Sequence, residues 1–106
     1  MITIHNLRLE KPVNIYDIKV DRTSVLGNPF YMRLESERDR VCDQYKEYIY
    51  KQIRDGNKRI IQELERLCQI YKTYGQLRLF CWCAPKRCHS ETIREIILKM
   101  CNVASI

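Results

Sequence analysis

The chain has 106 residues, of which 45% are apolar, and a formal net charge of +6. This length leaves no room for a second domain and this apolar fraction is too high for a disordered chain, so we expect one folded domain over residues 1–106. The sequence contains no run of about 18 apolar residues, which excludes a membrane-spanning helix.

The first third of the chain predicts two short strands and an irregular loop. Apolar and polar residues alternate in residues 2–7, as in a half-buried strand, and the stretch NIYDIKV at residues 14–20 predicts a second strand. The following loop, DRTSVLGNPF, contains the turn signal Gly27-Asn28-Pro29. We expect a tight turn here, because glycine accepts a positive φ and proline restricts the residue before it.

Two helices are predicted next. Ser36 is expected to cap the first helix, with Asp39 three residues later, and Gly56 to end it. Asn57 is expected to cap the second helix, which ends at Gly75. Apolar residues recur at helical spacing in both segments. They are Val41, Tyr45, Tyr48, Ile49 and Ile53 in the first, and Ile60, Ile61, Leu64, Leu67, Cys68 and Tyr71 in the second.

The last part of the chain predicts a buried strand and a third helix. The stretch LRLFCWC, residues 77–83, has apolar residues on both faces, which indicates an inner strand of a covered sheet. After the loop APKRCH, Ser90 is the expected N-cap of the last helix. The residues expected on the buried side of this helix are Ile93, Ile96, Ile97, Met100 and Cys101.

The predicted order of elements is strand, strand, helix, helix, strand, helix. Strands joined through helices are typical of α/β domains, so we expect a small Rossmann-like domain with a short, mainly parallel sheet and about three helices. Ligands of open parallel sheets bind beyond the carboxyl ends of the strands. If the second and third strands are parallel neighbours, the loops DRTSVLGNPF and CWCAPKRCH face the same crevice.

The six cysteines are interpreted as thiols, core residues or metal ligands rather than disulfides. The stretch MITIHNLRLEKP lacks the apolar segment of a secretory signal, so we expect a cytoplasmic protein, and disulfides are rare in that compartment. Cys42, Cys68 and Cys101 lie on the helical stripes and are expected in the core. The other three cysteines lie in CWCAPKRCH, residues 81–89.

A metal site is the first interpretation of CWCAPKRCH. Cys81, Cys83, Cys88 and His89 could supply the thiolates and the imidazole of a tetrahedral zinc site. Structural zinc sites, however, mostly use cysteines separated by two to four residues. A C-x-C pair and an adjacent Cys-His pair direct their side chains poorly at one centre, so we expect no metal and no other cofactor.

Catalysis by Cys88 is the second interpretation. Cys88 lies just before a predicted helix start, where the helix dipole lowers the pKa of a thiol. Cys88 and Arg94 have the C-x5-R spacing of cysteine phosphatases, but the residues between them contain no glycine and fit a helix better than a phosphate-wrapping loop. The candidate catalytic residues of an enzyme are Cys88, His89 or Glu91, and a nucleotide or nucleoside-phosphate hydrolase is therefore an alternative.

Ligand binding is the third interpretation and the one we favour. The start of the last helix offers backbone N–H groups, the Ser90 hydroxyl and nearby cations to an anion, with Arg22 opposite. Trp82 either stacks on a base or lies in the core, and His89 either contacts the ligand or hydrogen-bonds the loop. The expected ligand-binding residues are Arg22, Thr23, Ser24, Gly27, Asn28, Pro29, Trp82, Cys83, Pro85, Arg87, His89 and Ser90.

The charge pattern favours an anionic partner. Residues 67–106 contain six basic and two acidic residues, which suits such a partner. Residues 33–66 interleave nine basic with eight acidic residues, so no continuous basic stripe forms and sequence-specific nucleic-acid binding is not expected. A small core gains from self-association, so a homodimer is a further expectation.

Two stretches resemble the motifs of an uncharacterised domain family, numbered 4326, that is frequent in phages and bacteria. The family has an Arg-x-Ser-x-Leu-Gly-Asn-Pro-Phe stretch and a late Cys-Trp-Cys-x-Pro-x-x-Cys-His-Gly-Asp stretch. The chain departs from the second stretch at Ser90 and Glu91, where glycine and aspartate are usual. The matching residues are Arg22, Ser24, Leu26, Gly27, Asn28, Pro29 and Phe30 in the first stretch, and Cys81, Trp82, Cys83, Pro85, Cys88 and His89 in the second.

The resemblance carries no established activity. By analogy with small Rossmann-like nucleotide binders, it implies a phosphate-bearing nucleotide or a nucleotide-derived signalling molecule as the ligand. With a phage origin, the protein would sequester a host immune signal in the host cytoplasm. Besides the hydrolase, the alternative is a phage protein that binds a host protein or nucleic acid through its Arg- and Lys-rich helices.

Overall fold

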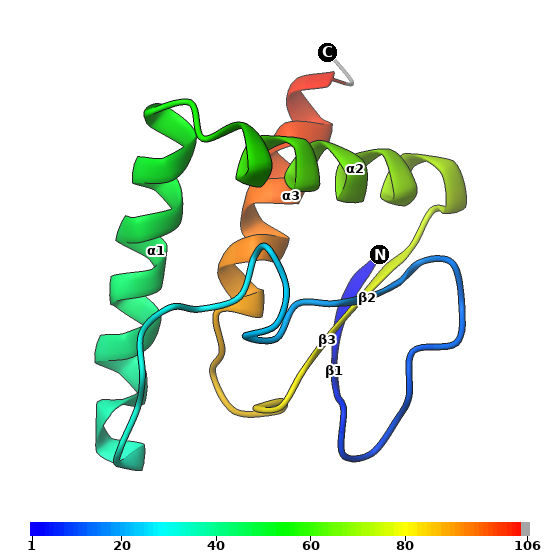
Figure 1. Ribbon diagram of the computed structural model, residues 1–106. Helices are drawn as coiled ribbons and strands as arrows, with labels where there is room; N and C mark the ends of the chain where they lie inside the picture. The colour runs from blue at the N-terminus through cyan, green and yellow to red at the C-terminus, as the bar shows by residue number, and fades with distance from the viewer. Residues whose placement is uncertain (105–106) are drawn as a thin grey trace.

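The computed structural model describes residues 1–104, in which three parallel strands and three α-helices are arranged as an α/β fold (Figure 1). The sheet has the order β1-β3-β2, so the predicted α/β class with a parallel sheet is confirmed. The elements are β1 (Ile2–Asn6), β2 (Asp17–Lys19), the 3-10 helix η1 (Glu35–Glu37), α1 (Arg38–Arg54), α2 (Lys58–Tyr74), β3 (Leu77–Cys81) and α3 (Ser90–Ala104).

The strand β3 lies in the centre of the sheet and is the most deeply buried strand. Its Leu79 pairs with Ile4 of β1 and with Ile18 of β2. Leu77 and Leu79 point into the main core, whereas Phe80 is covered by the His5 ring, stacked at 5.2 Å, and by the Arg78 guanidinium at 5.3 Å. The prediction of an inner strand is confirmed, although the strand ends at Cys81 and not at residue 83.

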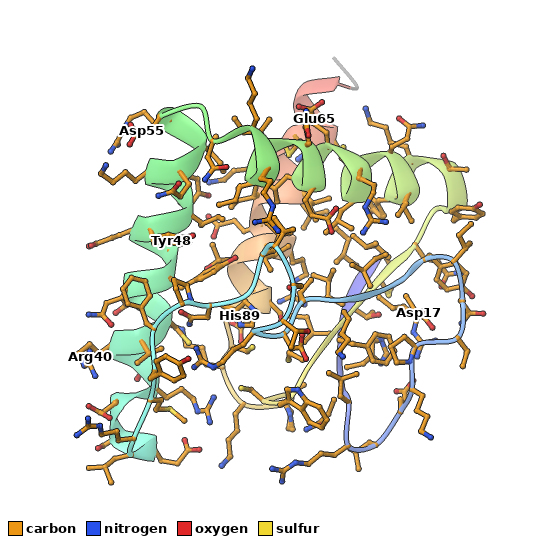
Figure 2. All side chains as sticks on the ribbon, in the orientation of Figure 1. Asp17, Arg40, Tyr48, Asp55, Glu65 and His89 are labelled. Atoms are coloured by element: carbon orange, nitrogen blue, oxygen red, sulfur yellow. The ribbon has the colours of Figure 1, made fainter. Side chains whose placement is uncertain are left out.

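The helices supply the rest of the main core. Both α2 and α3 contact β3, and α1 contacts α2. Tyr45 of α1 is fully buried, and its hydroxyl donates a hydrogen bond to the Leu26 carbonyl at 2.7 Å, which fastens the loop after β2 to α1. Charged side chains such as Arg40, Asp55 and Glu65 lie on the outer faces of the helices (Figure 2). The apolar stripes predicted from the sequence therefore face the core.

The helix ends were predicted in part. Asn57 accepts a hydrogen bond from the Ile60 N–H as the N-cap of α2, and Gly75 ends α2 with φ +72°, as expected. The prediction that Ser36 caps α1 is wrong, because Ser36 lies within η1. Glu37 Oε1 instead accepts the N–H groups of Arg33 at 2.9 Å and Leu34 at 3.1 Å, so a carboxylate fixes the entry to this helix.

The second strand is shorter than predicted. Residues 14–16 precede β2, which begins at Asp17. Asp17 Oδ2 accepts the N–H groups of Val13 and Asn14, both at 2.9 Å, and these bonds form a turn before the strand. Among the helices of the described residues, none is long and apolar enough to cross a membrane.

Candidate functional site

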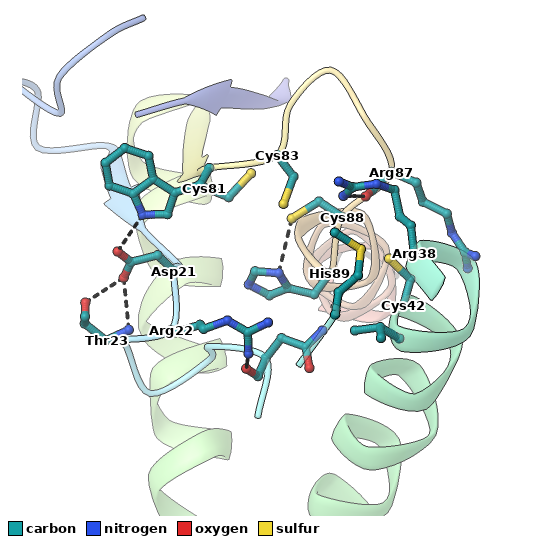
Figure 3. A pocket seen from close by; sticks show the side chains of 14 residues that line it. Asp21, Arg22, Thr23, Arg38, Cys42, Cys81, Cys83, Arg87, Cys88 and His89 are labelled. Atoms are coloured by element: carbon teal, nitrogen blue, oxygen red, sulfur yellow. Dashed lines mark hydrogen bonds between the residues drawn. The ribbon is translucent and has the colours of Figure 1, made fainter. Parts of the chain in front are cut away.

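The two loops singled out in the sequence leave the same edge of the sheet. Their strands, β2 and β3, are parallel neighbours, and Val20 continues the pairing with a hydrogen bond to the Phe80 carbonyl at 2.9 Å. Beyond this edge lies a cavity of about 250 Å³ with walls from both loops and from α1 (Figure 3). The expectation that both loops face one crevice is therefore confirmed.

The predicted ligand-binding residues divide into two groups. One group lines the cavity: Arg22, Thr23, Asn28, Trp82, Cys83, Arg87 and His89. The other group does not line it: Ser24, Gly27, Pro29, Pro85 and Ser90. The remaining lining residues are Asp21, Met32, Arg38, Val41, Cys42, Cys81 and Cys88.

Asp21 joins the two loops. Its Oδ1 accepts the Thr23 hydroxyl at 2.6 Å and the Thr23 N–H at 3.2 Å, and its Oδ2 accepts the Trp82 indole N–H at 3.3 Å. Burial opposes ionisation of Asp21, but the hydrogen bonds from Thr23 and Trp82 outweigh it and lower the pKa below its usual value. Sequence reasoning missed this residue, because its role depends on a partner 61 positions away.

Gly27 is needed for a different reason than expected. Within the described residues, positive φ occurs at Gly56 and Gly75, so the predicted positive φ at Gly27 is wrong. The loop instead folds back on itself, and a Cβ at Gly27 would lie 2.4 Å from the Asp21 carbonyl oxygen and 2.8 Å from Arg22 Cα. Glycine is therefore required here by the close approach of two backbone segments.

Arg22 closes the same loop and is exposed. Its Nη1 donates to the Asn28 carbonyl at 2.5 Å, and its guanidinium lies 4.5 Å from the centre of the Tyr31 ring. It makes no second hydrogen bond within residues 1–104, and a guanidinium has five N–H donors. The remaining donors of Arg22 are available at the cavity.

His89 holds the second loop against the first. Its Nε2 lies 2.5 Å from the Val20 carbonyl, which can only accept, so Nε2 carries the proton and Nδ1 accepts the Cys88 thiol at 3.2 Å. Its ring also meets the Tyr45 ring edge to face at 5.0 Å. Burial lowers the pKa of His89, so the imidazole is neutral. Of the two roles considered, the hydrogen bond to the loop is the one observed.

Three cysteines lie together in the wall of the cavity, where Cys83 packs against the buried Cys81, Ala84 and Cys88. The Cys88 thiol donates to His89 Nδ1 at 3.2 Å, and its sulfur lies 3.5 Å from the Ser90 hydroxyl. The neighbouring sulfurs and burial raise the pKa of Cys88, whereas the neighbouring Cys88 thiol lowers the pKa of Cys81 and of Cys83. Among the described residues, no group of three or more His, Cys, Asp or Glu side chains is arranged to hold a metal ion.

Two arginines dock the second loop on α1. Arg38 donates to the Arg87 carbonyl at 2.9 Å and pairs with Glu35. Arg87 in turn donates to the carboxylates of Asp39 at 3.0 Å and Asp43 at 2.7 Å. No local sequence pattern predicts this role of Arg38, because its contact with the loop spans 49 residues.

The start of α3 is already occupied by groups of the protein. Ser90 is the first residue of α3 and not its N-cap, and it is fully buried with its hydroxyl 3.5 Å from Cys88 Sγ. The Glu91 and Thr92 N–H groups donate to the carbonyls of Cys88 and His89. The expected anion-binding site at this helix start is thus filled by backbone carbonyls and sulfur.

The three candidate catalytic residues, Cys88, His89 and Glu91, do not all lie at the cavity. Cys88 and His89 are in contact, but Glu91 does not line the cavity. Its Oε2 instead accepts the Cys88 backbone N–H at 3.3 Å.

A protein-family model described as Domain of unknown function (DUF4326) matches residues 5–99. This range contains both loops of the cavity and every element except the first residues of β1 and the end of α3. No curated protein and no solved structure matches the chain.

Proposed function

The chain belongs to the DUF4326 family of domains of unknown function, and we propose that its cavity binds a phosphate-bearing nucleotide or a nucleotide-derived signalling molecule. The observation that carries this proposal is the meeting of Arg22, Arg38 and Arg87 with the Trp82 indole around one cavity. Cations near an aromatic face suit a ligand that joins a phosphate to a base.

Arg22 is the group proposed to contact the phosphate. Its side chain is exposed and has unused donors, and a guanidinium can pair two phosphate oxygens at once. Arg38 and Arg87 are already paired with carboxylates, which compensate their charge, so they contribute less to a phosphate contact than Arg22. This division of roles predicts that Arg22 matters most for affinity.

Trp82 and Asn28 are proposed to contact the base or the sugar. Trp82 is 52% exposed and its indole N–H is held by Asp21, so a ring face is presented at the rim. The Asn28 side-chain NH2 makes no hydrogen bond within residues 1–104 and lies in the cavity wall.

The volume of the cavity limits the size of the ligand. It is about 250 Å³, slightly below the range of roughly 300–1,000 Å³ for sites of drug-sized ligands. We therefore propose a ligand of mononucleotide size whose base extends to the rim.

Binding without turnover is the favoured form of this proposal. A hydrolase would need Cys88 as a nucleophile, but Cys88 is only 4% exposed, which keeps a bound nucleotide away from its sulfur. The carboxylate of Glu91 lies outside the cavity wall. A protein that holds its nucleotide unchanged would sequester it.

Calorimetric titration with AMP, ADP, a cyclic dinucleotide and inorganic phosphate tests the proposal. We expect saturable binding of at least one nucleotide, weakened in Arg22→Ala and unchanged in the matched control Arg59→Ala, an exposed arginine of α2 away from the cavity. Phosphate release during incubation would favour the hydrolase. No binding by any of these probes, together with specific capture of duplex DNA, would favour the interaction protein.

A further inference from the structure

Cys83 and Cys88 are two thiols in contact at a cavity that opens to solvent. Cys83 packs against the buried cluster of Cys81, Ala84 and Cys88, and all three cysteines line the cavity (Figure 3). The structure records all of these cysteines as free thiols. Two thiols held in contact are the starting point for disulfide formation, provided that one of them can be reached from outside.

The two thiols differ in accessibility. Cys88 is 4% exposed and Cys81 is 1% exposed, whereas Cys83 is partly exposed. Arg38 and Cys83 line the same cavity, and the positive charge of the guanidinium favours the thiolate form of Cys83. Cys83 is therefore the sulfur that a small oxidant meets first, and Cys88 is the sulfur behind it.

We propose that Cys83 and Cys88 are a redox-active dithiol, in which Cys83 reacts first with a low-molecular-weight disulfide and Cys88 completes an internal disulfide. The proposal is independent of the nucleotide-binding proposal, because it concerns the sulfurs of the cavity wall and needs no bound ligand. It also gives a role to Cys88 and His89, whose contact nucleotide binding does not require.

The two steps conserve atoms and electrons. The Cys83 thiolate attacks one sulfur of oxidised glutathione, a mixed disulfide forms and one glutathione thiolate leaves. Cys88 then gives its proton to His89 Nδ1, which already accepts its thiol, and attacks Cys83 Sγ. The Cys83–Cys88 disulfide forms, and the second glutathione leaves as a thiolate that takes up this proton. One protein dithiol is oxidised and one glutathione disulfide is reduced.

A second thiol pair in the chain provides an internal comparison. Cys68 of α2 and Cys101 of α3 have their sulfurs 2.9 Å apart, and they lie outside the cavity. Burial, followed by the contact with Cys68, raises the pKa of Cys101 to about 11, so Cys101 has little thiolate at neutral pH, and Cys68 is only 5% exposed. We therefore expect the Cys68–Cys101 pair to react more slowly than Cys83, despite its short sulfur separation.

The experiment exposes the reduced full-length protein to oxidised glutathione for increasing times, blocks free thiols in acid, and maps the cysteines by peptide mass spectrometry. Cleavage after Arg78, Lys86 and Arg87 places Cys81 and Cys83 on one peptide and Cys88 on another. Fragmentation of the cross-linked peptides between Cys81 and Cys83 then identifies the partner of Cys88. We expect the Cys83–Cys88 cross-link to form before the Cys68–Cys101 disulfide. Cys101→Ser is the matched control, because it removes the comparison pair and should leave the cavity disulfide intact.

Two substitutions separate the steps. Cys88→Ser should stop the reaction at glutathione bound to Cys83, and Cys83→Ser should abolish both the adduct and the cavity cross-link. The proposal is overturned if Cys83 remains unmodified while Cys68 and Cys101 oxidise, or if the cross-link joins Cys81 to Cys88. Should Cys88→Ser fail to fold, the order of disulfides in the wild type and the Cys83→Ser result still decide between these outcomes.

Discussion

Trp82 Nε1 donates a hydrogen bond to Asp21 Oδ2 at 3.3 Å, although 61 residues separate them in the sequence. This bond joins the loop after β3 to the loop after β2 at the point where both leave the sheet. It holds an exposed indole at the rim of the cavity rather than in the core. The hydrogen bond explains why a tryptophan next to a buried strand is half-exposed at the rim of the cavity.

Arg22→Ala should reduce ligand affinity with little loss of stability. Hydrogen bonds to charged groups contribute roughly 1.5–3 kcal/mol, and we expect a loss of binding free energy in this range. The bond to the Asn28 carbonyl is partly buried, but the Arg22 side chain is exposed, so the free energy of unfolding should fall by about 1 kcal/mol. Calorimetric binding and thermal unfolding of the same samples measure both quantities.

Leu64→Ala should have the opposite effect, because Leu64 is 2% exposed in the core and does not line the cavity. A loss of about 2–5 kcal/mol of stability is expected for such a truncation, with binding per folded molecule unchanged. If Arg22→Ala instead unfolds the protein and leaves binding per folded molecule intact, Arg22 is a structural residue.

Asp21 should make the stability of the protein depend on pH in the acidic range. Its pKa is lowered in the folded state, so its contribution is present above the unfolded value of about 3.9 and is lost as the pH falls through the lower folded value. The difference in unfolding free energy between wild type and Asp21→Asn should therefore be largest near neutral pH and shrink below about pH 4. Urea unfolding at several pH values measures it.

Glu47→Gln is the control for this pH dependence, because Glu47 is exposed and has no ion pair among the described residues. Its difference from wild type should stay small over the same pH range. An Asp21→Asn difference that is equally small at every pH would contradict the role assigned to Asp21.

Gly27→Ala should destabilise the loop after β2. The new Cβ would meet backbone atoms at 2.4 Å and 2.8 Å, and backbone must move to relieve this contact. We expect a loss of about 1–3 kcal/mol, as for other overpacked sites, and weaker ligand binding because Arg22 moves with the loop. Gly56→Ala is the comparison: it places a side chain at φ +79° in open space and should leave binding unchanged. Equal binding by Gly27→Ala and wild type would argue against this loop as part of the site.

Zinc should not hold the fold together. The loop that carries Cys81, Cys83 and Cys88 is held by packing and by hydrogen bonds from Arg38 to the Arg87 carbonyl and from His89 to the Val20 carbonyl. We therefore expect substoichiometric zinc in the purified protein and an unchanged circular dichroism spectrum after chelation. One tightly bound zinc per chain, with unfolding on its removal, would make this loop a structural metal site.

Local patterns in the sequence predicted the elements better than the details of the site. The apolar stripe with Tyr45 in α1, the stripe with Leu64 in α2 and the helix stop at Gly75 each depend on neighbours in one helix, so spacing alone predicts them. The common edge of the two loops follows from parallel strand order.

The wrong or missing predictions concern residues at which segments far apart in the sequence come into contact. Ser90 was expected at an open helix start, but sulfur and carbonyl groups from residues 81–89 surround that start and bury it. Arg38 was not predicted at all, because its place in the cavity wall depends on how the second loop docks on α1. Gly27 was identified, but the reason for it was contact with Asp21 and not its own φ.

The most direct test of the account is to identify the small molecules that the protein retains from cells. Wild-type and Arg22→Ala protein would be purified in parallel, denatured, and their released molecules compared by mass spectrometry. We predict a phosphate-bearing nucleotide that is enriched with the wild type and depleted with Arg22→Ala. A retained molecule without phosphate, or equal recovery of a nucleotide from both proteins, would contradict the proposed site.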